Sequence, residues 1–444
     1  MKLVYDVDAK IKDMGFLNTL VFALQQLLAI MAATIAVPAI IGNGMSSTAA
    51  LFGAGVGTLV YLLFTKFRSP VFLGSSFAFI GSMFAAFAGG ASMAAGYLGL
   101  ILGAAFAGLV YVVLAICVKF AGVGWINKLM PPVVIGPTVA IIGLSLAGNA
   151  VGDLSKGSVL VDNVPTASPY VALICGLVTL FVTIISSVYG KKMIKLIPFI
   201  MGILAGYAVA AVFTLIGTAT DNAALMVIDF AKFEAMKWIP DFTFLTAFGG
   251  IKDIDAAFIG TVAVAYIPVA FVVFAEHIAD HKNLSSIIEK DLLTEPGLHR
   301  TLLGDGIGSF AGSIFGGCPN TTYGESVGCV AISGNASVAT IFTTAIMAIV
   351  ISFFGPFATF LSTIPSCVMG GICIALYGFI AVSGLKMIQA IDLNQNKNLF
   401  VVSVILIAGV GGLAVSFGKV TITSIACALI LGIITNTIVG KAKD

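Results

Sequence analysis

The sequence predicts an all-helical polytopic membrane protein with about fourteen transmembrane segments, each near the roughly 20 apolar residues that cross a bilayer. Of the 444 residues, 59% are apolar and 9% are charged, and the mean hydropathy is +1.12. A water-soluble globule cannot carry that balance on its surface. Charged or turn-rich interruptions separate the apolar runs from near residue 15 to near residue 440. The bilayer is therefore the expected solvent.

The expected segments form two halves of seven. They are 16–40, 48–65, 77–90, 94–118, 129–148, 168–188 and 196–217, followed by 256–279, 301–316, 325–333, 336–354, 361–382, 398–416 and 420–439. The halves occupy residues 16–217 and 255–440, and the stretch 218–254 connects them. No cleavable signal is expected, because residues 1–15 are charged and polar.

Lysine and arginine predict the orientation. With a cytoplasmic amino terminus, 17 of the 22 basic residues lie inside and 5 lie outside, namely Lys156, Lys232, Lys237, Lys252 and Lys419. The positive-inside rule gives this division for an even number of spans with both termini cytoplasmic. Residues 1–15 are then cytoplasmic, and the connection 218–254 is external.

The third segment of each half is too short to cross a bilayer as helix alone. Arg68-Ser-Pro-Val-Phe-Leu-Gly-Ser-Ser-Phe77 leads into the first, and Gly316-Gly-Cys-Pro-Asn-Thr-Thr-Tyr-Gly-Glu325 leads into the second. Irregular backbone of this kind survives at membrane depth only where protein or a water-filled cavity satisfies its polar groups. Paired interruptions in two halves indicate a transporter site at the interface of inverted repeats. The alternative is a pair of ordinary loops between miscounted spans.

Three acidic residues, Glu276, Asp305 and Glu325, fall within or at the edge of apolar spans. Each costs about 3 kcal/mol at a helix centre on insertion scales, so an acid there is a functional hypothesis. Asp280 lies one turn after Glu276 on the same helix face. In the alternative interpretation, the acids satisfy backbone N–H groups at broken helix ends, and Asp280 marks the cytoplasmic end of its helix.

The spans contain no lysine or arginine that could neutralise these acids. Such carboxylates repel anions and favour a metal cation or a neutral molecule with N–H donors. A planar ring would stack on Phe77 or Tyr323, donate to Glu276 and Glu325, and accept a backbone N–H near Gly324. Burial and mutual repulsion would let either carboxylate take up a proton. The cysteines and histidines lack metal-site spacing, so no metal or cofactor is expected.

Several stretches resemble one transporter family. They are Gln25, Gly74-Ser-Ser-Phe77, Phe274-Ala-Glu-His-Ile-Ala-Asp280, Asp291-Leu-Leu-Thr-Glu-Pro-Gly-Leu-His-Arg300 and Pro319-Asn-Thr-Thr-Tyr-Gly-Glu325. In this order they resemble the nucleobase-ascorbate transporter family, specifically its bacterial uracil permease branch. The resemblance implies two inverted seven-span repeats, with short strands before the half-length spans 3 and 10. It also implies a core domain from spans 1–4 and 8–11, a gate domain from spans 5–7 and 12–14, proton symport and a homodimer.

The residue pattern and the resemblance together name the candidate site. The expected substrate-binding residues are Phe77, Glu276, Tyr323, Gly324 and Glu325. The residues expected in proton coupling or supporting contacts are Gln25, Glu276, Asp280, Asp305 and Glu325.

The sequence also departs from the family pattern. Where the family signature has asparagine, threonine and a basic residue, this chain has Ser326, Ser333 and Gly334. The second residue of a common Gln-His pair is Gln26, and a histidine of some uracil permeases is replaced by Asp280. These changes flank the expected pocket, so they bear on substrate range rather than on fold.

The sequence therefore predicts proton-coupled uptake of uracil or a closely related pyrimidine by alternating access, in a bacterial plasma membrane. A purine permease for xanthine or urate is the alternative, although Glu325 favours uracil because glutamine is commoner there in the purine branch. An anion transporter of the same architecture would need basic groups at the site, and these are missing.

No enzyme is expected, because the spans lack HExxH and GxSxG motifs. A net charge of +2 gives no reason to expect a nucleic-acid partner; the expected partners are the nucleobase, protons, lipid and a second copy.

Overall fold

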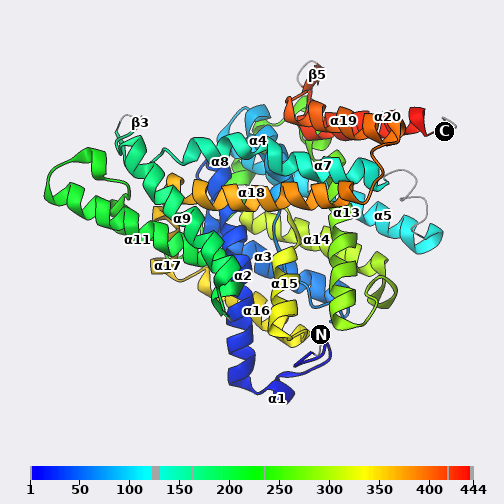
Figure 1. The fold of residues 1–444 in the computed structure, drawn as a ribbon, viewed down its shortest axis with the longest axis horizontal. Helices are drawn as coiled ribbons and strands as arrows, with labels where there is room; N and C mark the ends of the chain where they lie inside the picture. Colours follow the sequence, from blue (N-terminus) through cyan, green and yellow to red (C-terminus); the bar gives the residue numbers. More distant parts are fainter. Residues whose placement is uncertain are drawn as a thin grey trace.

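The computed structural model describes residues 3–122, 131–161, 164–191, 193–234, 236–417 and 420–440. Helices make up most of this part of the chain (Figure 1). Among the described helices, eight are long and apolar enough to cross a membrane, or nine if a pair bent by 83° forms one span. This is the architecture of a polytopic helical membrane protein.

The elements of the first half follow the expected ranges closely. They are α1 (Ile11–Met14), α2 (Phe16–Ile41), α3 (Ser47–Phe64), β1 (Leu73–Ser75), η1 (Phe77–Phe79), α4 (Ile80–Gly89), α5 (Met93–Ala121), α7 (Pro132–Ser145), α8 (Ala147–Asp153), β2 (Leu160–Val161), β3 (Val164–Pro165), α9 (Pro169–Tyr189), α10 (Met193–Leu196) and α11 (Pro198–Ala219). Residues 129 and 130 of the expected fifth span lie outside the described part of the chain.

The connection between the halves consists of short helical turns, and longer helices resume after it. The connection holds η2 (Ala223–Leu225), η3 (Phe230–Phe233), α12 (Thr243–Ala247) and η4 (Phe248–Asp253). The second half holds α13 (Ala256–Ile288), η5 (Leu293–Gly297), α14 (Leu298–Gly316), β4 (Asn320–Thr322), α15 (Gly324–Ser333), α16 (Val338–Ile351), α17 (Gly355–Thr363), α18 (Ser366–Gln389), α19 (Asn396–Val410), β5 (Val415–Phe417), β6 (Val420–Ile422) and α20 (Ser424–Val439). Each segment expected from the sequence overlaps a helix.

Several expected boundaries are wrong. The helix predicted at 361–382 begins only at Ser366, because Pro365 lacks a backbone donor and disfavours helical geometry at the residue before it. The separate helix α17 precedes it and is bent by 83° from α16. The last two predicted helices are shorter than expected, since β5 and β6 form an antiparallel hairpin between them. By contrast, α13 continues past the expected residue 279 to Ile288.

The two irregular stretches meet at the centre of the molecule. Strand β1 pairs antiparallel with β4, and Gly74 lies opposite Thr321. Both strands are buried, and each leads directly into one of the two short helices, as the family resemblance implies. Their pairing satisfies backbone groups that have no water to bind at this depth.

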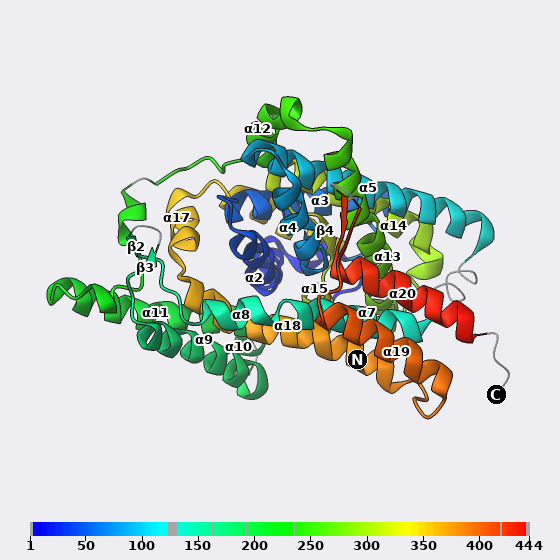
Figure 2. The same cartoon turned by 90° about the horizontal axis from the view of Figure 1, so that it is seen from above.

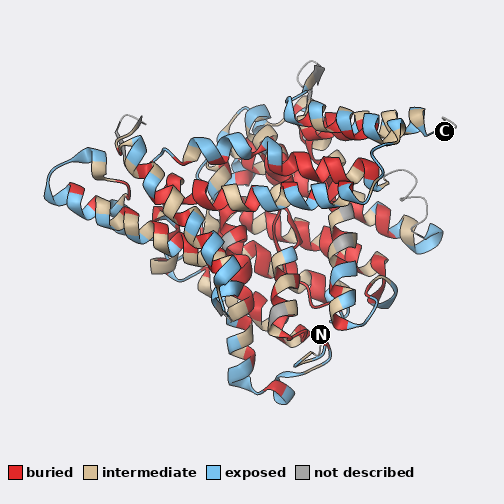
Figure 3. Cartoon of the chain, viewed as in Figure 1, coloured by how far each residue is buried: buried red, intermediate tan, exposed pale blue. Residues whose placement is uncertain are grey.

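The helices form two layers (Figure 2). In layer A, helices α2, α3, α4, α5, α13, α14, α15 and α16 pack on one another. In layer B, helices α7, α8, α9, α11, α18, α19 and α20 pack on one another. The buried residues concentrate in the middle of the molecule (Figure 3), whereas α5 and α9 expose large apolar side chains such as Leu109, Phe120, Phe181 and Ile185 on their outer faces. Such surfaces suit lipid rather than water.

The amino-terminal segment is tied to the end of α15. The backbone N–H groups of Val4 and Tyr5 donate to the carbonyl of Gly334 at 2.8 and 3.2 Å, and Ala336 N–H donates back to the carbonyl of Tyr5 at 2.9 Å. Gly334 caps α15 with φ +67°, where glycine avoids the strain of a side chain. An added Cβ would also lie 3.2 Å from Val4 Cγ2. This geometry accounts for glycine at a position where the family signature has a basic residue.

Lys290, just after α13, binds both Asp6 and Asp8 through Nζ at 3.0 Å. Burial tends to raise the pKa of Asp6, but the backbone N–H of Val7 and the Lys290 ammonium outweigh it and hold that pKa below its usual range. A lowered pKa stabilises the fold above the unfolded value of about 4, and this contribution is lost as pH falls through the folded value.

We expect Asp6→Asn to cost less than about 1 kcal/mol, because both side chains are largely solvent-exposed. Thermal unfolding in detergent at several pH values measures the effect. The difference from wild type should be present at neutral pH and shrink as the pH is lowered through the acidic range. A difference that stayed constant with pH would contradict the ion-pair explanation.

Candidate functional site

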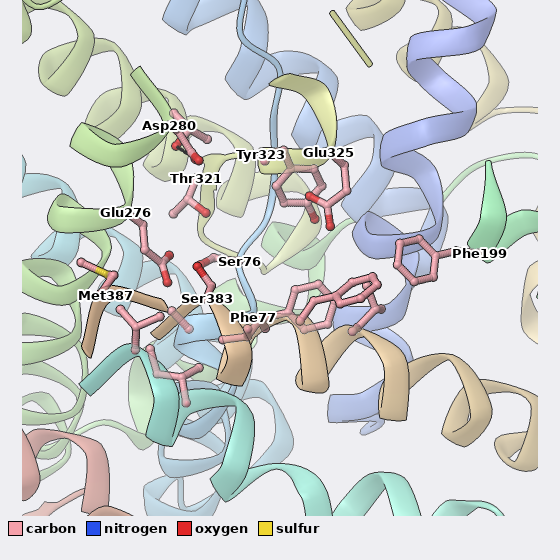
Figure 4. A pocket seen from close by; sticks show the side chains of 18 residues that line it. Ser76, Phe77, Phe199, Glu276, Asp280, Thr321, Tyr323, Glu325, Ser383 and Met387 are labelled. Atoms are coloured by element: carbon pink, nitrogen blue, oxygen red, sulfur yellow. Dashed lines mark hydrogen bonds between the residues drawn. The ribbon is translucent and has the colours of Figure 1, made fainter. Parts of the chain in front are cut away.

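A cavity of about 440 Å³ lies between layers A and B (Figure 4). Layer A contributes the three carboxylates of the described cavity lining and the ends of both irregular stretches. Its lining residues are Ser76, Phe77, Ala78, Glu276, Asp280, Thr321, Thr322, Tyr323, Gly324 and Glu325. Layer B contributes a mainly apolar wall: Val139, Ile142, Phe199, Leu376, Phe379, Ile380, Ser383 and Met387. A concave pocket with a few convergent polar groups is the usual form of a small-molecule site.

Helix α13 carries two of the carboxylates. Glu276 and Asp280 are one turn apart, so both face the cavity, as the sequence spacing predicts. The hydroxyl of Thr322, in β4, donates to Asp280 Oδ2 at 2.8 Å. No hydrogen bond to the Glu276 side chain is found within the described residues, which leaves its oxygens available for N–H donors of a ligand.

The third carboxylate lies at the start of α15. Tyr323 is the N-cap residue and Glu325 is in the first turn, where the helix dipole and free N–H groups favour negative charge. The same free N–H groups, near Gly324, can bind a ligand carbonyl. The helix start therefore presents backbone donors and a carboxylate next to each other at the cavity.

The two aromatic candidates have different surroundings. Tyr323 is buried, and its hydroxyl donates to the carbonyl of Ser75 at 2.7 Å. Phe77 is half-buried and meets Tyr377 edge-on, with ring centroids 6.1 Å apart. The Tyr323 ring is therefore held by the β1 backbone, and Phe77 is the less constrained stacking surface.

Asp305 and Gln25 do not line the cavity. Asp305 is fully buried and pairs with His277, an interaction that the sequence interpretation missed. Gln25 has a buried Oε1 without a hydrogen-bond partner in the described structure. Among the residues named from the sequence, the structure brings together Phe77, Glu276, Asp280, Tyr323, Gly324 and Glu325 around one cavity.

Two departures from the family pattern contact each other. The side-chain amide of Gln26 donates to the hydroxyl of Ser326, a very short contact, and to the Ser326 carbonyl at 3.3 Å. The backbone N–H of Phe72 donates to the same hydroxyl at 3.2 Å. Ser326 thus joins α2, the approach to β1 and the start of α15, next to Glu325. The paired departures in the sequence were the signal that could have indicated this contact.

The described residues contain no group of three or more His, Cys, Asp or Glu side chains arranged to hold a metal ion.

Comparisons with known proteins identify the family. The family model described as the Permease family matches residues 17–417. The uracil permease of Bacillus subtilis (strain 168) is 39% identical over 432 residues, covering 95% of this chain and 93% of that protein. The uracil permease of Bacillus caldolyticus is 39% identical over 419 residues, covering 94% and 90%.

A solved structure shares the fold. The transmembrane domain of a cyanobacterium bicarbonate transporter, BicA, aligns with a TM-score of 0.64 over 97% of this chain and 99% of that chain, at 16% identity. At this identity the likeness concerns the fold alone. The sequence matches are much stronger and cover nearly the whole chain, so this integral membrane protein belongs to the Permease family, the nucleobase-ascorbate transporter family that its motifs resemble.

Proposed function

We propose that this permease takes up uracil, or a closely related pyrimidine, by proton symport. The observation that carries the proposal is the group of three carboxylates, Glu276, Asp280 and Glu325, around one cavity of about 440 Å³. The described residues that line this cavity include no lysine or arginine. Such a site suits a neutral ring with imide and amide N–H groups. The relatives named uracil permeases support the choice of base.

The base would occupy the space between the layers. Its N–H groups would donate to Glu276 and Glu325, one carbonyl would accept from the backbone near Gly324, and its face would stack on Phe77. Asp280 would support the site through its bond to Thr322. The apolar wall of layer B would exclude water from the remaining faces.

Transport would use the two layers as moving parts. Layer A would serve as the core domain and layer B as the gate domain, each with elements from both inverted seven-span repeats. The antiparallel pairing of β1 with β4, at matching places in the two halves, supports the repeat arrangement. Rocking of one layer against the other would expose the cavity to each side of a bacterial plasma membrane in turn. Both termini would be cytoplasmic, and two copies would form a dimer.

The buried acids would provide the proton coupling. Carboxylates that line one cavity disfavour simultaneous ionisation, so uptake of a proton would relieve their repulsion when the base binds. The candidates remain Glu276, Asp280, Asp305 and Glu325, with Gln25 among the supporting residues.

The test is uptake of radiolabelled uracil into proteoliposomes under an inward proton gradient. We expect accumulation that a protonophore abolishes, that unlabelled uracil blocks and that unlabelled xanthine leaves unchanged. Block by xanthine would transfer the assignment to the purines. Absence of uracil uptake by well-folded protein would overturn the uracil assignment.

A further inference from the structure

A second polar cluster lies in layer A, separate from the substrate cavity. It consists of His277 and His281 on α13, Asp305 and Thr301 on α14, and Tyr61 on α3. All five residues are fully buried, and none lines the cavity. Burying so many polar groups in a membrane-spanning layer is costly, so their arrangement calls for a functional explanation.

The hydrogen bonds define where the protons lie on His277. Its Nε2 is 2.9 Å from the hydroxyl of Thr301, and that hydroxyl donates its single proton to the carbonyl of Leu298 at 3.0 Å. The Thr301 oxygen must therefore accept from His277, so Nε2 carries a hydrogen. The other ring nitrogen, Nδ1, is 2.7 Å from Asp305 Oδ2. Two lone pairs would repel at this distance, so a second hydrogen lies between them.

We propose that His277 and Asp305 together bind the coupling proton, which they share between Nδ1 and Oδ2 behind the substrate cavity. The proposal rests on the proton symport proposed above and names the residues that hold the proton. It adds His277, which the sequence patterns did not indicate. The pair is neutral as a whole, whether the shared hydrogen is drawn on the imidazole or on the carboxyl group.

The burial of the pair explains how it could couple proton release to movement. Among the described residues, His277 is the only ion-pair partner of Asp305, and Asp305 Oδ1 has no hydrogen-bond partner. Loss of the proton would leave a net negative charge on two side chains that are fully buried, and burying an uncompensated charge is strongly unfavourable. The pair therefore keeps its proton in this conformation. It can release the proton only when a rearrangement of layer A admits water.

The transfer is balanced in protons. On loading, a hydronium ion on one side of the membrane gives its proton to the pair and becomes water. On release, the N–H or O–H bond of the pair breaks, and water on the other side takes the proton. Neutral His277 and ionised Asp305 remain until the next cycle.

A row of polar groups leads from the pair toward the loop after α3. The imidazoles of His277 and His281 stack at 4.1 Å, and His281 Nδ1–H donates to the His277 carbonyl at 2.8 Å. His281 Nε2 therefore accepts from the Tyr61 hydroxyl at 2.7 Å, and this hydroxyl lies 2.7 Å from Ser69 Oγ. This row gives a polar path from the pair to the residue after Arg68.

Other titratable groups surround the pair and would contribute to any pH dependence. Those on neighbouring elements include Tyr61 of α3, Tyr111 of α5, Glu276, Asp280 and His281 of α13, and Glu325 of α15. The ring centroid of Tyr111 lies 6.2 Å from that of His277, and its hydroxyl has no hydrogen-bond partner in the described structure. A test must therefore separate the pair from the carboxylates of the cavity.

The test compares two assays on full-length protein in proteoliposomes. Exchange of labelled for unlabelled uracil without a gradient needs binding and rocking but no net proton transfer, whereas accumulation under an inward proton gradient needs coupling. We expect His277→Gln to keep exchange within about threefold of wild type and to lose accumulation, so that internal uracil only equals external uracil. Its exchange rate should also lose the pH dependence of the wild type.

Two further variants complete the design. His299→Gln makes the same change at the remaining histidine, outside the cluster, and should leave both assays unchanged. Asp305→Asn removes the shared proton while keeping the shape of the side chain. It should likewise keep exchange and lose accumulation, and it takes the place of His277→Gln if that variant does not fold. Wild-type accumulation by His277→Gln, or an equal loss of exchange and accumulation in both variants, would overturn the proposal. Wild-type protein that neither exchanges nor accumulates uracil would instead overturn the proposed function.

Discussion

Glu276→Gln should weaken uracil binding by about 10- to 100-fold, because a charge-assisted hydrogen bond contributes roughly 1.5–3 kcal/mol. Glu276 projects from α13 into the cavity, and no protein donor to its side chain is found in the described structure. Glutamine keeps the size of the side chain but offers an N–H group to a ligand N–H. Equilibrium binding of labelled uracil to detergent-solubilised protein measures the change.

The matched control is Glu289→Gln at the end of the same helix. Glu289 is exposed and lies outside the cavity, so the same chemical change there should leave binding at the wild-type value. Equal affinity of Glu276→Gln and wild type would mean that the Glu276 carboxylate does not accept from the base. The binding pose proposed here would then be wrong, although the choice of uracil could still stand.

Gly74→Ala should distort the site from within the fold. The new Cβ would overlap ring atoms of Tyr323 and lie 2.9 Å from Thr34 Oγ1. Tyr323 cannot move freely, because it is buried and its hydroxyl is bonded to the Ser75 carbonyl at 2.7 Å. Overpacking of this kind typically costs 1–3 kcal/mol, and here it would displace the residue two positions before Glu325. We expect a lower unfolding temperature and weaker uracil binding together.

Gly81→Ala is the control for this substitution. Its Cβ would lie 3.8 Å from the nearest atom, Ile425 Cδ1, which is an ordinary contact. Gly81 is within helix α4, where alanine is favoured over glycine by about 1 kcal/mol. The variant should therefore be at least as stable as wild type. Loss of stability in Gly81→Ala but not in Gly74→Ala would contradict the close approach of β1 to Tyr323.

The parts of the site that are local in sequence could be predicted. Glu276 and Asp280 are four residues apart, so a helix places both on one face whatever surrounds it. The glycine and proline residues before the two short helices likewise indicated irregular backbone around a cavity. The family resemblance implied the short strands, but their pairing across about 250 residues of chain appears only in the folded structure.

Contacts between distant segments could not be predicted in the same way. His277 meets Asp305 across 28 residues, and Gln26 meets Ser326 across 300. Periodicity gives the face on which a side chain lies, but the partner depends on how helices cross and on which backbones approach closely. The boundary errors at α17 and at the β5–β6 hairpin have a similar cause, because hydropathy does not register a bend or a short hairpin within an apolar run.

The sequence by itself determined that the chain lies in a membrane, approximately where its helices run, and which acids lie within apolar segments, since all three follow from composition and local periodicity. The tertiary structure alone decided that Asp305 does not share the cavity of the other three acids. It placed Glu276, Asp280 and Glu325 around one space and buried Asp305 behind it with His277. The physical reason is that the packing of α13 against α14 and α15 determines which side chains meet, and many packings satisfy the same pattern of apolar residues.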